Sequence, residues 1–253
     1  MDIPHTPSFR LDGRRALVTG ASSGIGLGAA VALAEVGAHV VCAARGADRL
    51  NDAVAAIRAS GLSAEAHPLD VADIDAVRAL CAEGPFDAVV NAAGIARHTP
   101  ALDTAPADYD AVMGVNLRGA YFLSVEAARA MQAAGRGGSI IHISSQMAHV
   151  GGIDRAVYCA TKHGLEGMVK SMAIEWGASG IRINSICPTF VRTPLTEQTF
   201  ENPERVKWIT DKIKLGRVGE VEDIMGAVVF LAGAASAMVT GTSLLIDGGW
   251  TAE

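Results

Sequence analysis

A tyrosine and a lysine that could carry proton chemistry lie four residues apart, as Tyr158 and Lys162. Positions i and i+4 of a helix share a face, so the lysine ammonium can lie beside the phenol. A neighbouring positive charge lowers the pKa of tyrosine from its reference value of about 10, which makes the phenol a usable proton donor or acceptor near neutral pH. Ser145, thirteen residues before Tyr158, could hold a substrate oxygen while the proton moves. The pair alone is more typical of an ordinary amphipathic helix, so its meaning depends on the rest of the chain.

A glycine-rich turn follows the first apolar run of the chain, with glycines at positions 20, 24 and 26. Glycine permits a tight turn and a close approach of the backbone to a ligand. The helix expected after the turn would offer free N–H groups and the positive end of its dipole to a pyrophosphate. The spacing differs from G-x-G-x-x-G, but the strand–turn–helix context favours dinucleotide binding over a purely structural turn.

Arg45 follows the second expected strand, where dinucleotide-binding units distinguish NAD from NADP. A carboxylate there would accept a hydrogen bond from the ribose 2′-hydroxyl, whereas a guanidinium would meet a 2′-phosphate. The residues before it are Ala43 and Ala44, so this segment carries no carboxylate. The sequence favours NADP and leaves NAD possible; the alternative is a solvated arginine that caps the turn.

Short apolar runs alternate with longer helical patterns along the whole chain. The expected strands are residues 16–19, 39–43, 64–69, 86–91, 139–143, 181–186 and 243–247. The expected helices are residues 24–36, 48–59, 109–131, 157–176 and 221–231. Apolar strands that alternate with helices indicate a parallel sheet covered on both faces. We therefore predict an α/β fold: one doubly wound Rossmann-type domain, residues 1–253, with a central seven-stranded parallel sheet.

One segment, residues 195–215, interrupts this alternation with Pro203 and several polar residues. An insertion near the carboxyl ends of the strands predicts a small lid over a site. A surface excursion or a contact between subunits is the alternative.

Composition excludes several classes of protein. The formal net charge is −6 and no long basic run occurs, which argues against a nucleic-acid partner. The cysteines stand singly and no His/Cys spacing suits a metal, so we expect neither a disulfide framework nor a metal site. No uncharged apolar run reaches the length of about eighteen residues that suggests a membrane span. The first residues show no secretory pattern, so the expected location is the cytoplasm.

Taken together, the glycine loop, Ser145, Tyr158 and Lys162 resemble the short-chain dehydrogenase/reductase family. The resemblance covers nearly the whole chain. The segment 91–94 matches the family's Asn-Asn-Ala-Gly motif except at Ala92, and the segment 188–193 matches Pro-Gly-x-x-x-Thr except at Thr189, which leaves the backbone geometry there open. The resemblance implies that the cofactor contacts are Gly20, Ser22, Ser23, Gly24, Ile25, Gly26, Arg45, Asp70, Val71, Asn91, Ala92, Gly94, Tyr158, Lys162, Pro188, Val191 and Thr193.

The resemblance also implies a mechanism, which is hydride transfer at a nicotinamide coupled to proton transfer by Tyr158. Ser145 would bind the substrate oxygen. Lys162 would lower the tyrosine pKa and hold the nicotinamide ribose, and Asn116 would anchor a water that connects Lys162 to solvent. These four residues are the expected catalytic set.

The substrate is expected to be a small molecule, because the chain is similar to sugar-acid and polyol dehydrogenases of the family. Acyl-thioester ketoreductases are the alternative, followed by a dehydratase or epimerase with tightly bound cofactor, or a non-catalytic nucleotide-binding protein. The expected substrate contacts are Ser145, Gln146, His98 and Trp208, with Arg97 and Arg155 as further candidates. The family resemblance also suggests a homotetramer.

Overall fold

A seven-stranded sheet forms the centre of the computed structural model, which describes residues 1–252. The strands are β1 (Arg15–Thr19), β2 (His39–Ala44), β3 (Ala64–Pro68), β4 (Ala88–Asn91), β5 (Gly138–Ile143), β6 (Ile181–Pro188) and β7 (Ser243–Ile246). They lie in the order β3-β2-β1-β4-β5-β6-β7, and every neighbouring pair is parallel. The predicted fold class is confirmed.

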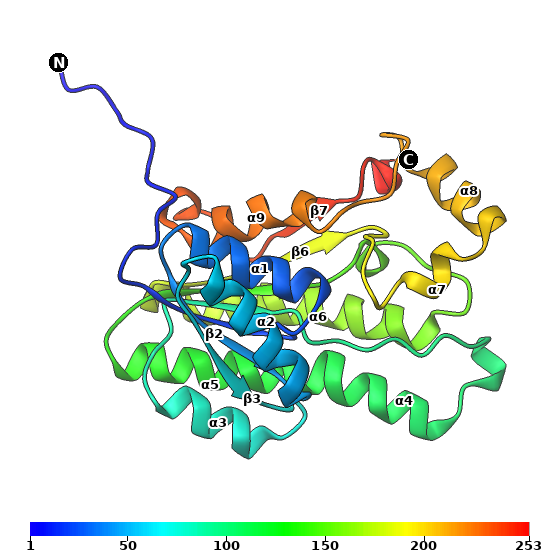
Figure 1. Cartoon of the computed structure of the whole chain (residues 1–253), viewed down its shortest axis with the longest axis horizontal. Coiled ribbons are helices and arrows are strands. Elements are labelled where there is room, and N and C mark those ends of the chain that lie inside the picture. The colour runs from blue at the N-terminus through cyan, green and yellow to red at the C-terminus, as the bar shows by residue number, and fades with distance from the viewer. Residues whose placement is uncertain (253) are drawn as a thin grey trace.

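Helices cover both faces of the sheet (Figure 1). One layer contains α1 (Gly24–Glu35), α2 (Ala47–Ala59) and α9 (Glu222–Ala232), and the other contains α3 (Ile74–Ala82), α5 (Ala120–Ala133) and α6 (Ala156–Trp176). Successive side chains of a strand point to opposite faces. Val18 therefore packs in the first layer and Leu17 in the second, and both are fully buried. A strand buried on both sides needs a continuous apolar run, which is the pattern seen in the sequence.

The strand order reverses between β1 and β4, which pair side by side with Thr19 opposite Asn91. The connections from these two strands leave in opposite directions, so a crevice opens at their carboxyl ends. The glycine turn follows β1 directly, and the segment that starts at Ala92 follows β4. This part of the fold therefore determines where a ligand can lie.

The long helix predicted for residues 109–131 is interrupted. The structure has α4 (Pro106–Met113), a π-helical segment η2 (Gly114–Gly119) and then α5. The backbone passes close to its surroundings here, because a Cβ at Gly119 would lie 2.8 Å from the carbonyl oxygen of Val71. Single π turns inside α-helices are frequent at functional sites, and this one carries Asn116.

Residues 195–215 contain two short helices, α7 (Glu197–Phe200) and α8 (Pro203–Lys212), which extend from one end of the molecule (Figure 1). Asn202 caps α8 by accepting hydrogen bonds from the backbone N–H groups of Glu204 and Arg205 at 3.0 and 3.1 Å. The segment is anchored by a small apolar cluster in which Ile209 and Ile213 pack with Met147, Phe190 and Val218. The insertion expected from the sequence is thus present, and its role as a lid is a proposal.

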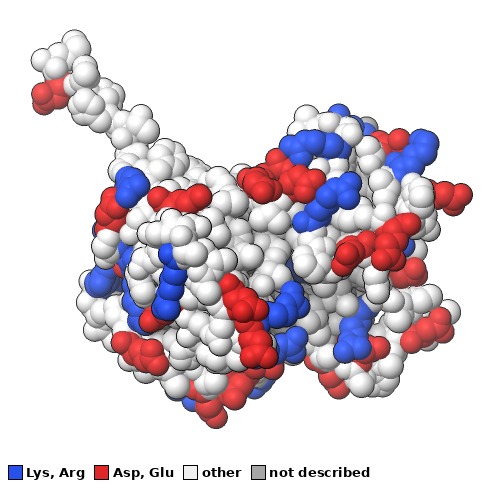
Figure 2. All heavy atoms as spheres, in the orientation of Figure 1, with Lys and Arg blue, Asp and Glu red and all other residues white. Residues whose placement is uncertain are grey.

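Acidic and basic side chains are interspersed over the face shown in Figure 2, and no stripe of one sign is visible there. Within residues 1–252, no helix combines the length and the apolar character required to cross a bilayer.

Candidate active site

Three elements bring the expected catalytic residues together. Tyr158 and Lys162 lie in the first turns of α6, and the Lys162 Nζ is 5.6 Å from the centroid of the tyrosine ring. Ser145 follows β5 and begins the short 3₁₀ helix η3 (Gln146–Ala148). Its hydroxyl accepts a hydrogen bond from Met147 N–H at 3.1 Å and interacts with the Tyr158 phenol. Tyr158, Lys162 and Ser145 are therefore neighbours in space.

The electrostatics at Tyr158 differ from the expectation. Burial raises the pKa of the phenol, while the interaction with Ser145 and the charge of Arg155 act in the opposite direction. Lys162 was expected to supply the lowering charge, but its ammonium is directed to the carbonyl oxygen of Ile143 at 2.9 Å. Arg155 is therefore a further cation that favours the phenolate, which the sequence did not indicate.

Lys162 is itself strongly perturbed because its side chain is 5% exposed. Burial lowers the pKa of the ammonium to about 8, although the nearby Cys187 and Glu166 act to raise it. A lysine with this pKa can gain or lose a proton near neutral pH. The structure therefore places a second proton-exchanging group beside the phenol.

The buried Asn116 side chain joins the π segment to the loop after β4. Its Nδ2 donates to Ile95 O at 2.8 Å, and its Oδ1 accepts from Ile95 N–H at 2.9 Å. The same Nδ2 lies 3.5 Å from the hydroxyl of Thr161 on α6. The amide thus fixes the crevice loop against the catalytic helix.

The glycine turn forms a cradle that larger residues would fill. A Cβ at Gly26 would lie 2.2 Å from Gly20 O, and a Cβ at Gly20 would lie 2.8 Å from the backbone of Ala92 and Ala93. The first turn of α1 has neither a side-chain cap at Ser23 nor an acidic residue. Its N–H groups and dipole therefore suit an anion such as a pyrophosphate.

Residues 188–193 lie across from this cradle. A Cβ at Gly24 would be 3.2 Å from the side chain of Thr193, so the phosphate loop and this segment face each other. Thr189, which departs from the family glycine, does not have a positive φ, so the backbone accommodates threonine without strain. Its buried hydroxyl has no hydrogen-bond partner. A bound carboxamide would meet polar groups here, which is consistent with a nicotinamide.

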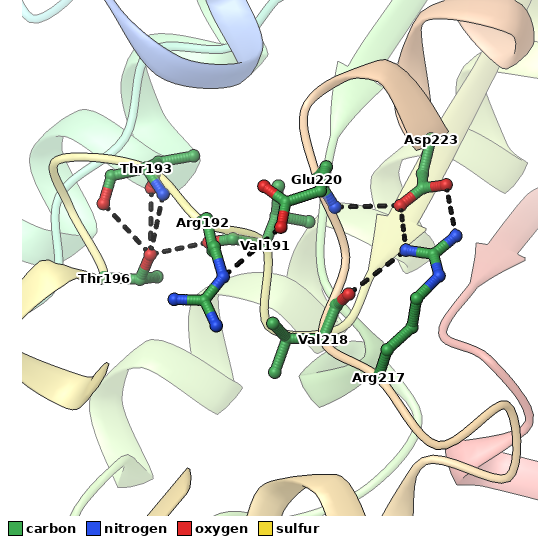
Figure 3. A network of polar contacts seen from close by, with 8 residues as sticks. All are labelled: Val191, Arg192, Thr193, Thr196, Arg217, Val218, Glu220 and Asp223. Carbon is green, nitrogen blue, oxygen red and sulfur yellow. Dashed lines mark hydrogen bonds and ion pairs between the residues drawn. The ribbon is translucent and has the colours of Figure 1, made fainter.

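A network of polar contacts holds the two ends of the 195–215 segment together (Figure 3). Arg217 donates two hydrogen bonds of 2.7 Å to the Asp223 carboxylate, which also accepts from Glu220 N–H at 2.8 Å. Arg192 forms an ion pair with Glu220 at 3.3 Å, and Thr196 donates to Val191 O at 2.6 Å. This clamp positions Val191 and Thr193 relative to α9.

The remaining cofactor candidates line the crevice. Arg45 is exposed at the end of β2, and Asp70 accepts a hydrogen bond from Ala72 N–H at 2.9 Å. Asn91 is buried and bonds to the Thr19 hydroxyl at 2.7 Å and to the His142 ring at 3.2 Å, so its side chain joins neighbouring strands. Ala92 donates its N–H to Thr19 O at 3.2 Å, so this backbone segment stays in place without the family's second asparagine.

On the substrate side, two candidates, Gln146 and His98, lie beside the catalytic residues, and a third, Trp208, lines a cavity near them. The Gln146 amide is 1% exposed and makes no hydrogen bond. His98 lies edge-on to Tyr158 with ring centroids 6.1 Å apart. Trp208 contacts Trp250 in a cavity beside Arg155 and Arg205. Arg97 pairs with Asp108 at 3.2 Å instead. Trp250 and Arg205 were not predicted, because only folding brings residues so distant in sequence to one cavity.

His149, Glu166 and Cys187 offer nitrogen, oxygen and sulfur atoms within 4.8 Å of one another, the one such group in residues 1–252. The Glu166 carboxylate already accepts a hydrogen bond from Ser185 at 2.7 Å and another from Ser243. Burial disfavours this charge, yet these hydrogen bonds lower the pKa of Glu166 overall. Hydroxyl donors therefore satisfy the Glu166 carboxylate, and we propose no metal site at these three residues.

Comparisons with known proteins agree with this geometry. A short-chain dehydrogenase family model, described as enoyl-(acyl carrier protein) reductase, matches residues 20–251. Gluconate 5-dehydrogenase of Gluconobacter oxydans is 39% identical over 98% of this chain and 99% of its own. D-threitol dehydrogenase of Mycolicibacterium smegmatis is also 39% identical, over 96% of this chain and 95% of its own.

Solved structures give the same result. A putative 2-deoxy-D-gluconate 3-dehydrogenase of Agrobacterium tumefaciens with bound NADP is 42% identical, with a TM-score of 0.91 over 97% of this chain and 99% of that one. A gluconate 5-dehydrogenase of Burkholderia cenocepacia in complex with NADP and tartrate is 38% identical, with a TM-score of 0.93 over 97% of this chain and 98% of that one. The chain therefore belongs to the short-chain dehydrogenase/reductase family and is an NAD(P)-dependent oxidoreductase.

Proposed function

We propose that the protein interconverts a secondary alcohol and a ketone, with Tyr158 as the acid/base group. The observation that carries this proposal is the contact between the Tyr158 phenol and Ser145, with Lys162 on the same helix face and the glycine cradle at the neighbouring strand ends. A nicotinamide cofactor, when bound, exchanges a hydride with the substrate carbon.

The protein residues handle the oxygen and the proton. In oxidation, the Tyr158 phenolate takes the hydroxyl proton of the substrate while the C–H bond breaks and the C=O bond forms. Ser145 donates a hydrogen bond to the same oxygen and keeps it within reach of the phenol. In reduction, Tyr158 returns the proton to the developing alkoxide. Lys162 supports this transfer as a buried group whose pKa of about 8 allows proton exchange with the phenol.

NADP is the preferred cofactor in this proposal. Arg45 is exposed at the end of β2 and forms no ion pair within the described residues, so its guanidinium is available to a 2′-phosphate. Both of the related structures described above contain NADP. Replacement by an acidic residue, Arg45→Glu, tests this directly. The ratio of kcat/KM for NADP to that for NAD is expected to fall by more than about tenfold, since a charge-assisted contact is lost and a repulsive one is added. An unchanged ratio would contradict the assignment.

The substrate is a sugar acid, a polyol or a related hydroxy compound in this proposal. The related enzymes named above act on gluconate and threitol by their names. The unpaired amide of Gln146 offers both a donor and an acceptor to hydroxyl groups. The test is a panel of polyols, sugar acids and β-keto esters, followed by reduced-nicotinamide absorbance with NAD and with NADP. Turnover confined to the β-keto esters would favour an acyl-thioester ketoreductase.

A homotetramer is the proposed assembly. A cavity of about 360 Å³ lies between α5 and α6 and is lined by Tyr121, Met168, Met172 and Trp176 among others. Tyr121 in this lining is 45% exposed, and Ile174 on α6 is 85% exposed, so apolar surface on both helices is open to a partner. Light scattering of the purified protein tests this, and a monomer would contradict it. We also propose a cytoplasmic location, since all four cysteines are free and Cys42, Cys81 and Cys187 are buried thiols.

A further inference from the structure

A cavity of about 360 Å³ lies between η3, the start of α6 and α8. Phe190, Trp208 and Trp250 form its apolar wall. Its polar lining includes two arginines, Arg155 and Arg205, together with Asn202 and Glu204. No residue of the glycine cradle lines this cavity, so its charges are separate from those that face a cofactor pyrophosphate.

Arg155 is a buried cation without an anionic partner. Its side chain is 8% exposed, and within residues 1–252 no carboxylate lies in ion-pair distance of it. Its contacts are the His98 ring, with Nη1 at 3.3 Å from Nδ1, and the face of Phe190 at 5.5 Å. Burying a charge without a counter-charge is costly. The guanidinium therefore has unused capacity to bind an anion.

The surroundings keep this positive charge uncompensated. Burial together with the charges of Arg155 and Arg205 lowers the pKa of His98 to about 4, so the ring is neutral at physiological pH. Burial and the charge of Arg205 also lower the pKa of Arg155. Asp154 and Glu204 are the nearby acidic groups, and both are exposed and unpaired with either arginine. Asp154 has a φ of 59°, the one non-glycine residue with positive φ in the described chain. This turn places Arg155 directly before α6.

The position of Arg155 relative to Tyr158 fits a substrate group. His98 contacts both residues, edge-on to the tyrosine ring at 6.1 Å and to the guanidinium at 3.3 Å. The cavity that Arg155 lines also adjoins the other catalytic hydroxyl, because Met147 in its wall donates its N–H to Ser145. A hydroxy acid has this arrangement, with the reacting carbon and the carboxylate separated by a short carbon chain.

We propose that Arg155 and Arg205 form a carboxylate-binding subsite that selects sugar acids over neutral polyols. Arg155 is the fixed, buried anchor, and Arg205 adds a second cation from the exposed side of α8. A guanidinium binds a carboxylate through two parallel N–H donors, which gives direction as well as charge. This inference rests on the proposed function and narrows its substrate class.

The experiment compares kcat/KM for an aldonate with that for its primary amide, which has the same shape without the charge. It uses the full-length protein with saturating NADP. We expect the wild type to prefer the aldonate, and the preference to fall by about 10- to 100-fold in Arg155→Gln, mainly through KM, as for loss of a charge-assisted hydrogen bond. Because Arg155 also acts on the Tyr158 phenol, both substrates can lose turnover in this variant, and the ratio of the two kcat/KM values is the readout for the carboxylate. Arg155→Lys should restore part of the preference, because lysine returns the positive charge but not the two parallel N–H donors of the guanidinium.

Arg205→Gln gives a second variant that does not disturb the core, because this side chain is exposed. It should reduce the preference by a smaller factor. Lys207→Gln is the matched control: it removes one positive charge from the same helix, but Lys207 pairs with Asp211 and does not line the cavity. Binding of tartrate, followed by the fluorescence of Trp208 and Trp250, gives a readout besides activity and should weaken in Arg155→Gln.

The outcomes separate this inference from the function on which it rests. Equal use of aldonate and amide by the wild type, or an unchanged preference in both arginine variants, would overturn the carboxylate subsite while alcohol oxidation still stands. A stronger preference for a phosphorylated polyol than for the aldonate would also overturn it. If no alcohol or ketone of the panel reacts, yet tartrate binding depends on Arg155, the subsite is supported and the proposed reaction fails.

Discussion

Replacement of Gly26 by alanine tests the cofactor cradle most sharply. The added Cβ would lie 2.2 Å from the carbonyl oxygen and 2.6 Å from the carbonyl carbon of Gly20. Both are backbone atoms, so a side-chain rotation cannot relieve the clash. The loop and the start of α1 must move apart by about 1 Å, and overpacking of this kind costs about 1–3 kcal/mol of stability. The domain is expected to fold with a slightly lower melting temperature.

The effect on the cofactor should be much larger than the effect on folding. A misplacement of about 1 Å can cost about 100-fold in rate, and here the displaced groups are the N–H donors expected to hold the pyrophosphate. We expect kcat/KM for the cofactor to fall by about 100-fold or more, with a matching loss of affinity in a fluorescence titration. Circular dichroism would confirm that the variant is folded.

Gly226→Ala is the matched control. Gly226 lies in α9, and a Cβ there would meet no atom within 4 Å. Alanine is about 1 kcal/mol better than glycine inside a helix, so this variant should melt about 2–4 °C higher and bind cofactor normally. The reasoning about the cradle is refuted if Gly26→Ala, folded, binds NADP as tightly as the wild type.

Three further predictions concern Lys162, the clamp and the core. The pKa of Lys162 is about 8 in the folded state, below its ordinary value of 10.5. Between these two pH values the unfolded state binds more protons than the folded state. The free energy of unfolding should therefore rise with pH across this range, by about 3 kcal/mol in total. The unfolding free energy of the wild type minus that of Lys162→Met, measured by urea titration from pH 7 to 11, should show this rise, and a flat difference would count against the buried ammonium. Asp223→Asn removes the negative charge and one of the two oxygens that accept from Arg217, so the substrate KM and proteolysis within residues 195–215 should increase. Asp211→Asn breaks an ion pair confined to α8 and should change neither, and equal behaviour of the two variants would exclude a clamp. Leu33→Ala empties a fully buried position and should cost about 2–5 kcal/mol, whereas Leu102→Ala, at a fully exposed position, should be neutral by thermal unfolding; similar losses would contradict the assigned core.

Much of the fold could be predicted from the sequence, because apolar strands buried on both faces leave a clear pattern. The apolar run that contains Leu17 and Val18 placed β1 within one residue of its observed start. α3 was not predicted, although Asp73 caps it through Asp75 and Ala76 N–H and Val77 and Leu80 supply its buried face. The π segment η2 was not predicted either, since residues 114–119 fit a helical pattern and the close approach of Gly119 to Val71 appears only in the folded chain.

The site shows a similar division. Spacing along one helix placed Tyr158 beside Lys162, and the structure agrees. The spacing of the two residues predicts that Lys162 lowers the tyrosine pKa, whereas the hydrogen bond from its ammonium to Ile143 O becomes visible only in the structure. Arg155 was only a candidate in the sequence, since burial without a carboxylate partner becomes visible only when α6, the loop at His98 and α8 are assembled. The tertiary contacts of Tyr158, Lys162 and Arg155, and not the local sequence pattern, determine the electrostatic environment of each side chain.

The central claim is that Tyr158 transfers the proton. The most direct measurement is kcat of Tyr158→Phe on the best substrate of the panel, with cofactor affinity measured in parallel. Loss of a positioned acid/base group removes about 100- to 10,000-fold in rate, so the account predicts a drop in kcat of at least about 100-fold with cofactor binding retained. Turnover at the wild-type rate by the folded variant would contradict it.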